Sequence, residues 1–152
     1  MRTLKIAILF LIITLNGSFS IQAQTMTLEE TRSFFLKVLE NEGVKGWIDS
    51  DGDVQFTYND HEYYFWTDGF GKFLSINRFD VWEIENEEER ANAYRACSII
   101  SKDSRITKAY VKNDYVWFSI ELFLTDMKDL DVLFFDCIEL LEAAHENLIS
   151  EM

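Results

Sequence analysis

The segment Tyr115–Leu124 alternates between apolar and mixed positions along its whole length. Successive side chains of a β-strand point to opposite faces of the sheet, so this pattern predicts a strand with two unlike faces. The first face is wholly apolar and carries Val116, Phe118, Ile120, Leu122 and Leu124. The second face is mixed and carries Trp117, Ser119, Glu121 and Phe123. A wholly apolar sheet face has to be buried against another layer of structure, which predicts helices packed on one side of the sheet.

Three amphipathic segments can supply that helical layer. We expect helices over residues 27–42, 86–101 and 127–149. Thr27 and Asn86 are suitable N-cap residues for the first two helices, and Gly43 ends the first. Thr125 or Asp126 can cap the third helix, which has the longest apolar stripe of the three.

The remaining patterns predict strands joined by short turns. We expect these strands over residues 44–48, 54–58, 61–67, 73–84, 106–112 and 115–124. Asn59-Asp60 and Asn113-Asp114 favour tight hairpin turns, and the fourth strand is expected to bend or break near Arg78. The element order is therefore α-β-β-β-β-α-β-β-α. This order predicts an α+β fold in which helices pack on a mostly antiparallel sheet.

The first 23 residues have the pattern of a cleavable secretory signal. Arg2 and Lys5 precede an apolar run over residues 6–15, and small and polar residues follow up to a cleavage site after Ala23. Ten apolar residues span only about 15 Å as a helix, roughly half of a bilayer core, so no membrane anchor is expected. The alternative is a buried N-terminal helix of the domain.

Cleavage after Ala23 would leave a single domain over residues 24–152 and place it in the periplasm or outside the cell. Two basic residues would leave with the signal, so 12 basic residues would face 27 acidic ones and the formal charge would change from −13 to −15. This charge argues against nucleic acid and anionic membranes as partners. It is compatible with a cationic partner, but solubility alone is its simplest explanation.

The motifs that usually carry chemistry are absent or incomplete. Asp49-Ser-Asp51-Gly-Asp53 begins like a calcium loop, but Val54 and Asp60 stand where that loop needs Gly and Glu, so we expect a hairpin turn. His61 and His145 fall on different elements without the spacing of zinc ligands. We expect no metal site, no cofactor and no catalytic residues.

Cys97 and Cys137 lie on the apolar stripes of two different predicted helices. Export would permit a disulfide between them, but their positions favour two buried, unbridged thiols. Neither cysteine has a CxxC or metal-ligand spacing.

The order of elements, the segment Asp53–Trp66, the segment Val116–Leu124 and the amphipathic C-terminal helix together resemble a known family. The chain resembles the type III secretion chaperone-like fold, and in particular the YbjN-type proteins labelled bacterial sensory transduction regulators. This resemblance implies a noncatalytic protein-binding or regulatory role, often as a homodimer. It assigns no functional residue.

A candidate binding surface follows from the alternation of side chains between the two faces of each strand. If the first and third helices cover the apolar face of the sheet, Trp117 and Phe123 lie on the opposite face. Phe73 and Phe79 join them if their strand keeps its parity past Arg78. This aromatic face is either a site for a protein or peptide or is covered by the helix over 86–101 or by a second subunit. We therefore expect an exported, noncatalytic module that binds an unknown protein or peptide through this face and that helix. The alternative is a small-ligand-binding or hydrolytic domain with a pocket between helix and sheet.

Overall fold

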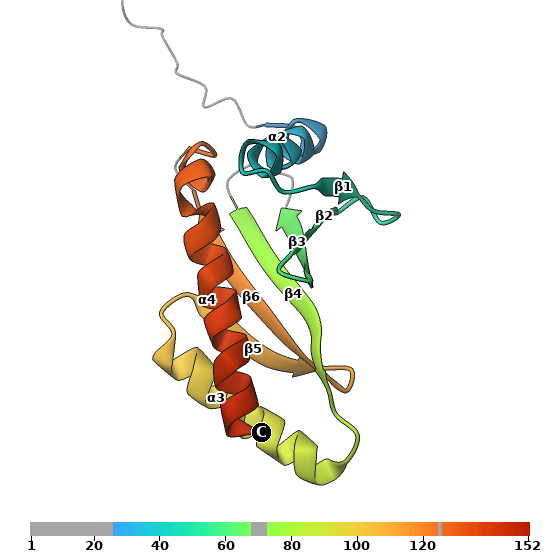
Figure 1. Ribbon diagram of the computed structural model, residues 1–152, viewed down its shortest axis with the longest axis vertical. Coiled ribbons are helices and arrows are strands. Elements are labelled where there is room, and N and C mark those ends of the chain that lie inside the picture. The colour runs from blue at the N-terminus through green and yellow to red at the C-terminus, as the bar shows by residue number, and fades with distance from the viewer. Residues whose placement is uncertain (1–25, 68–72, 125) are drawn as a thin grey trace, which may run out of the picture.

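The computed structural model describes residues 26–67, 73–124 and 126–152, so the predicted signal peptide over 1–23 lies outside the described residues. Within those ranges the predicted element order and the α+β class are confirmed (Figure 1). The elements are α2 (Leu28–Asn41), β1 (Gly46–Ile48), β2 (Val54–Tyr58), β3 (His61–Thr67), β4 (Phe73–Glu83), α3 (Glu87–Asp103), β5 (Thr107–Lys112), β6 (Tyr115–Phe123) and α4 (Asp129–Glu151).

The six strands form one sheet in the order β1-β2-β3-β4-β6-β5, and every neighbouring pair is antiparallel. The predicted hairpin turns lie at Asn59-Asp60 and Asn113-Asp114, where all four residues have positive φ. Asn and Asp tolerate this left-handed conformation better than other residues with a side chain, and it matches the twist of two-residue hairpins.

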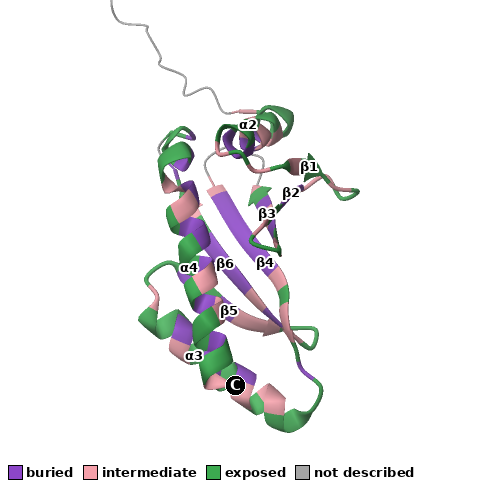
Figure 2. Cartoon of the chain, viewed as in Figure 1, coloured by how far each residue is buried: buried purple, intermediate pink, exposed green. Residues whose placement is uncertain are grey.

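The helices pack against one face of the sheet. Helix α2 lies against β1, β2 and β3, whereas α4 runs along β4, β6 and β5, and α3 packs against α4 and the edge strand β5 (Figure 1). The buried stripe of each helix is turned inward and the exposed stripe outward (Figure 2). Ring stacking joins the layers, because Phe65 of β3 contacts both Phe35 of α2 at 4.6 Å and Phe134 of α4 at 6.1 Å between ring centroids.

Strand β4 changes register with β6 between Arg78 and Trp82, just after the residue where we expected a bend. Asp80 lies inside this irregularity with a φ of 51°. An extra residue at such a bulge shifts the pattern of faces beyond it. Phe79 directly precedes Asp80 and still lies on the same face as Phe73, as the prediction required, because its ring packs on Trp117 of β6.

Two helix N-termini agree with the sequence, and the third does not. Thr27 forms a capping box with Glu30, and the Asn86 side chain accepts the N–H of Glu89 at 2.9 Å. The predicted side-chain cap of α4 was wrong in detail, because the helix begins at Asp129 with Lys128 as its N-cap and no side-chain cap bond. The Asp126 carboxylate instead accepts the N–H of Lys128 at 3.0 Å, within a preceding turn. The other proposed cap, Thr125, lies outside the described residues.

Other predicted boundaries also move, by one or two residues each. The first strand begins at Gly46 rather than at residue 44, because the Val44 N–H donates to the Leu39 carbonyl at 2.8 Å and so belongs to the end of α2. Helix α3 continues to Asp103, two residues beyond its predicted end.

Helix α3 also closes one edge of the sheet. The Ser101 hydroxyl donates to the Ala109 carbonyl at 3.1 Å and accepts the Ala109 N–H at 2.8 Å. The backbone of β5 at this position is therefore satisfied by a side chain and not by another strand. Cys97 of α3 and Cys137 of α4 are both buried and unbridged, in agreement with the sequence prediction.

Candidate functional site

The structure places all four predicted surface residues on the sheet face opposite the helices. Phe73 of β4 lies directly across from Phe123 of β6, with 5.2 Å between ring centroids. Phe79 of β4 packs on Trp117 of β6 at 4.2 Å. Phe123 is 82% exposed, so this end of the face is open to solvent. The four rings form two pairs along the same two strands.

Three further aromatic side chains, which the sequence analysis missed, complete this surface. Tyr64 stacks on Phe79 at 4.8 Å, Trp66 meets Phe73 edge-on at 5.7 Å, and Tyr110 lies 6.2 Å from Trp117. Tyr110 could have been found, because the turn at residues 113–114 pairs it with Trp117. We call the face carrying these seven rings the open face, and the face against the helices the covered face.

A shallow groove of about 250 Å³ runs across the open face. Its walls come from strands β3, β4, β5 and β6 and from the residue before β2, and no residue of α2, α3 or α4 lines it. The helix predicted over 86–101 corresponds to α3, which does not line this groove because it packs against α4 and the edge of β5. Its contribution to binding stays a prediction. The groove is lined by Asp53, Tyr64, Trp66, Phe73, Ser75, Asn77, Phe79, Tyr110, Lys112, Trp117 and Glu121.

The floor of the groove is polar and buried beneath the rings. Ser75 and Asn77 are about one-twentieth exposed, and the Ser75 hydroxyl donates to Asn77 Oδ1 at 3.0 Å. Beside them, Ser119 Oγ and Trp117 Nε1 are buried with no hydrogen-bond partner among the described residues. Unpaired buried polar groups are costly in a folded core, so polar atoms at the bottom of an aromatic groove are typical of a site that can receive a ligand.

Charged groups surround the rings. Lys112 Nζ lies over the Trp117 ring at 4.0 Å from its centroid, and Lys108 forms an ion pair with Glu121. Burial raises the pKa of the Tyr64 hydroxyl, and the nearby carboxylates of Glu62, Asp49 and Asp80 raise it further. The open face is therefore aromatic at its centre and carries both lysines and carboxylates around it.

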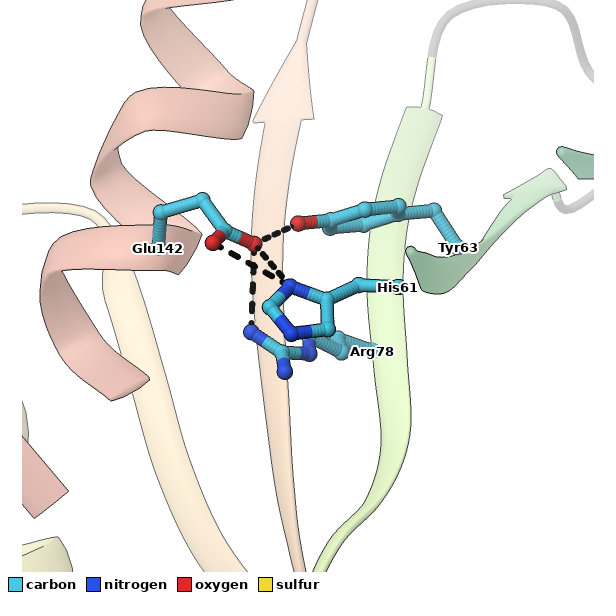
Figure 3. Close-up of polar contacts among 4 residues, drawn as sticks. All are labelled: His61, Tyr63, Arg78 and Glu142. Atoms are coloured by element: carbon cyan, nitrogen blue, oxygen red, sulfur yellow. Dashed lines mark hydrogen bonds and ion pairs between the residues drawn. The ribbon is translucent and has the colours of Figure 1, made fainter. Parts of the chain in front are cut away.

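A second polar cluster lies on the covered face, between α4 and the sheet (Figure 3). Glu142 of α4 accepts hydrogen bonds from the Tyr63 hydroxyl, from Arg78 Nη1 at 3.1 Å and from His61 Nδ1 at 2.9 Å. Because a carboxylate only accepts, Nδ1 of His61 carries the hydrogen in this contact. His145, one turn along α4, meets the His61 ring edge-on at 5.4 Å.

The electrostatics of this cluster keep Glu142 ionised. Burial acts to raise the pKa of Glu142, but hydrogen bonds from Tyr63 and His61 and the charge of Arg78 lower it below its ordinary value. Burial also lowers the pKa of Arg78 and raises the pKa of Tyr63. A carboxylate that already accepts from three side chains joins the helix to the sheet and is not a free acid or base. The sequence signal for this contact was Arg78 itself, a cation at a core-facing position.

The other sequence motifs have structural roles. Asp49 Oδ1 accepts the N–H groups of both Asp51 and Asp53 at 2.9 Å, so this carboxylate closes the predicted hairpin turn. Within residues 26–67, 73–124 and 126–152, no group of three or more metal-ligating side chains is found. None of the helices in those ranges is both long and apolar enough to cross a bilayer.

Comparison with known proteins yields a fold and no assigned activity. No family model matches the chain, and no curated protein matches it. Among solved structures, the chain is similar to YbjN of E. coli, described as a candidate transcription regulator, with a TM-score of 0.57 and 11% identity. The similarity covers 74% of this chain and 87% of the YbjN chain. At such low identity the comparison establishes architecture, and the chain therefore has a YbjN-like fold.

Proposed function

We propose that this chain is an exported, noncatalytic binding module that holds a protein or peptide segment in the groove of its open face. One observation carries the proposal: seven aromatic side chains line up on a face that none of the described helices covers. Contiguous exposed aromatic patches are costly in water and mark interaction surfaces, where Trp and Tyr contribute most of the binding energy. The YbjN-like fold is compatible with a regulatory or binding role, and the chaperone-like character implied by the sequence resemblance belongs to the same proposal.

The shape of the groove favours a segment of chain over a small molecule. Pockets for drug-sized ligands usually enclose about 300–1,000 Å³, and this groove is smaller and open. Its walls come from four neighbouring strands, which at about 4.8 Å apart span roughly 15 Å. An extended peptide crossing these strands could place alternate side chains between the rings.

The chemistry of the covered face supports a noncatalytic role. Glu142 is occupied by donors from its own chain, and burial raises the pKa values of Cys97 and Cys137 to about 11, which keeps both as unreactive thiols. The alternative, a hydrolytic or small-ligand site between helix and sheet, would have to use the cluster around Glu142. The groove on the open face does not reach that cluster, because neither Glu142 nor Arg78 lines it.

Site-specific photo-crosslinking tests the proposal. Benzoylphenylalanine replaces Phe123 on the open face or, as a matched control, Ile149, which is 57% exposed on α4. After irradiation of intact producing cells, we expect a discrete protein adduct only from position 123, identified by mass spectrometry. Equal adducts from both positions, or none from position 123, would argue against the open face as the site.

Export and self-association are part of the proposal and need their own measurements. Sequencing the N-terminus of the protein recovered from the periplasm or medium should give a chain that begins at Gln24. Light scattering should give the mass of a homodimer. A chain that retains residues 1–23 in the cytoplasm would remove the export claim, and a monomer mass would remove the dimer.

A further inference from the structure

We propose that the segment held by the open face is cationic and is recognised through arginine side chains that stack on the aromatic rings. This inference rests on the proposed function, and it adds the chemical class of the partner.

The first argument is a cation already present on the surface. The ammonium group of Lys112 lies 4.0 Å from the centroid of the Trp117 ring. The face of an aromatic ring carries partial negative charge and attracts cations, most strongly at Trp. The chain's own lysine thus shows that this part of the groove accepts a positive charge. A partner's guanidinium, which is planar and weakly hydrated, suits a stacked position better than an ammonium does.

The second argument is the arrangement of the rings. Trp117, Phe79 and Tyr64 follow one another at 4.2 Å and 4.8 Å, from β6 across β4 to β3. Trp66 and Phe73 continue the surface at the other end of the groove. A segment crossing the strands therefore meets ring faces at several successive positions, so more than one of its arginines could stack.

The third argument is the charge around the rings. Asp53 and Glu121 line the groove, and Glu62 reaches its rim, where it bonds the Gln55 amide at 3.2 Å. Glu121 forms an ion pair with Lys108, whose side chain is 57% exposed. Such exposed ion pairs contribute little, and arginine binds carboxylates in a bidentate manner, so a partner's arginine can replace Lys108 at low cost.

The charge of the whole chain acts in the same direction. A formal charge of −13 attracts a cationic segment over a longer range and repels an acidic one. It also disfavours a second copy of this chain as the occupant of the groove, because two such faces would bring like charges together. An arginine-bearing segment therefore satisfies both the rings and the charges that surround them.

Peptide binding to the protein purified from its producing cells tests this proposal. The probes are four blocked octapeptides of alternating composition, (Gly-Arg)4, (Gly-citrulline)4, (Gly-Lys)4 and (Gly-Glu)4. Citrulline keeps the planar shape of arginine without its charge. We expect (Gly-Arg)4 to bind about tenfold more tightly than (Gly-citrulline)4 and more tightly than (Gly-Lys)4 by titration calorimetry, with no binding of (Gly-Glu)4.

Variants locate the binding. Trp117→Ala and Glu121→Gln should each weaken (Gly-Arg)4 binding, whereas Glu88→Gln, an equal charge change on exposed α3, should leave it unchanged. Lys112→Met should strengthen it, because the chain's own cation no longer competes for the Trp117 ring. Circular dichroism of each variant verifies that the fold is retained.

Several outcomes would overturn the inference and leave the proposed function in place. One is equal affinity for the arginine and citrulline peptides. Another is preferred binding of (Gly-Glu)4 that the Lys112→Met substitution abolishes. The last is that none of the peptides binds, although position 123 gives adducts. Failure of the proposed function itself would be distinguishable, because position 123 would then give no adduct or the same adducts as position 149.

Discussion

The two faces of the sheet are made by alternate residues of the same strands, yet they differ in almost every physical respect. On β6, Phe118 and Ile120 are fully buried beneath α4, whereas Phe123 on the other face is 82% exposed. The covered face pairs its charged group, Arg78, with Glu142. Among the described residues, the open face leaves two buried polar atoms without a hydrogen-bond partner beneath its rings, and the covered face leaves one, Thr107 Oγ1. The difference indicates that the core lies mainly on the covered face, whereas binding is proposed for the open face.

The strongest test of this division is Phe118→Ala on the covered face. Removing a fully buried ring leaves a cavity, so we expect the free energy of unfolding to fall by about 3–5 kcal/mol. Urea denaturation followed by circular dichroism measures the change. A loss below about 1 kcal/mol would mean that the covered face is not the principal core.

A somewhat smaller loss in the free energy of unfolding is expected for Glu142→Ala. Its removal leaves Arg78, with only 7% of its side chain exposed, without a charged partner, and breaking buried ion pairs costs about 3–5 kcal/mol. Because Glu142 is itself 26% exposed, we expect the lower end of that range. Glu139→Ala, at an exposed site on the same helix, is the control. Equal effects of the two substitutions would show that the ion pair contributes no stability.

The same cluster predicts a pH dependence of stability. Burial, with the charges of Arg78 and His61, lowers the pKa of His145 below 6.5. The unfolded chain therefore binds this proton first, and stability should decline as the pH falls below about 6.5. A further decline should begin below about 4.5, since the pKa of Glu142 is also lowered in the folded state. Denaturation midpoints measured from pH 8 to pH 3 should show both stages, and His145→Asn should remove the upper one.

The smallest effect on stability is expected at the open face. Phe123→Ser should change the free energy of unfolding by no more than about 0.5 kcal/mol, because the ring is already largely in water. Thermal melts of this variant beside Phe118→Ala give the comparison directly. A destabilisation of 2 kcal/mol or more would mean that the open face also contributes to the core.

Much of the difference between the covered face and the open face could be predicted from the sequence, because the alternation of residues along a strand assigns each side chain to one face. Trp117 and Phe123 follow from the parity of β6, and Phe73 and Phe79 from that of β4 before its bulge. Tyr64 and Trp66 were missed because the segment His61–Thr67 is apolar on both sides. Its faces become distinct only once it is paired with β2, where Val54 lies opposite Phe65.

The polar cluster was beyond prediction for a different reason. Arg78 and Glu142 are 64 residues apart, and their contact depends on how α4 lies across the sheet. Periodicity identifies the buried stripe of a helix but does not determine its position along a strand. The start of α4 was misplaced for a local reason, since a turn closed by Asp126 takes up the residues that would otherwise be its first turn.

The contact between Ser101 and Ala109 has a consequence for assembly. A free strand edge can recruit another chain edge to edge, which is a common route to fibrous aggregates. The hydroxyl occupies both backbone groups of Ala109 on the outer side of β5, and the opposite edge of the sheet is the three-residue strand β1. The outer edge of β5 is thus occupied at Ala109 and the opposite edge of the sheet is short, so neither edge offers a long free strand to another chain. A protein whose open face is proposed to bind other chains would in this way be protected against uncontrolled polymerisation.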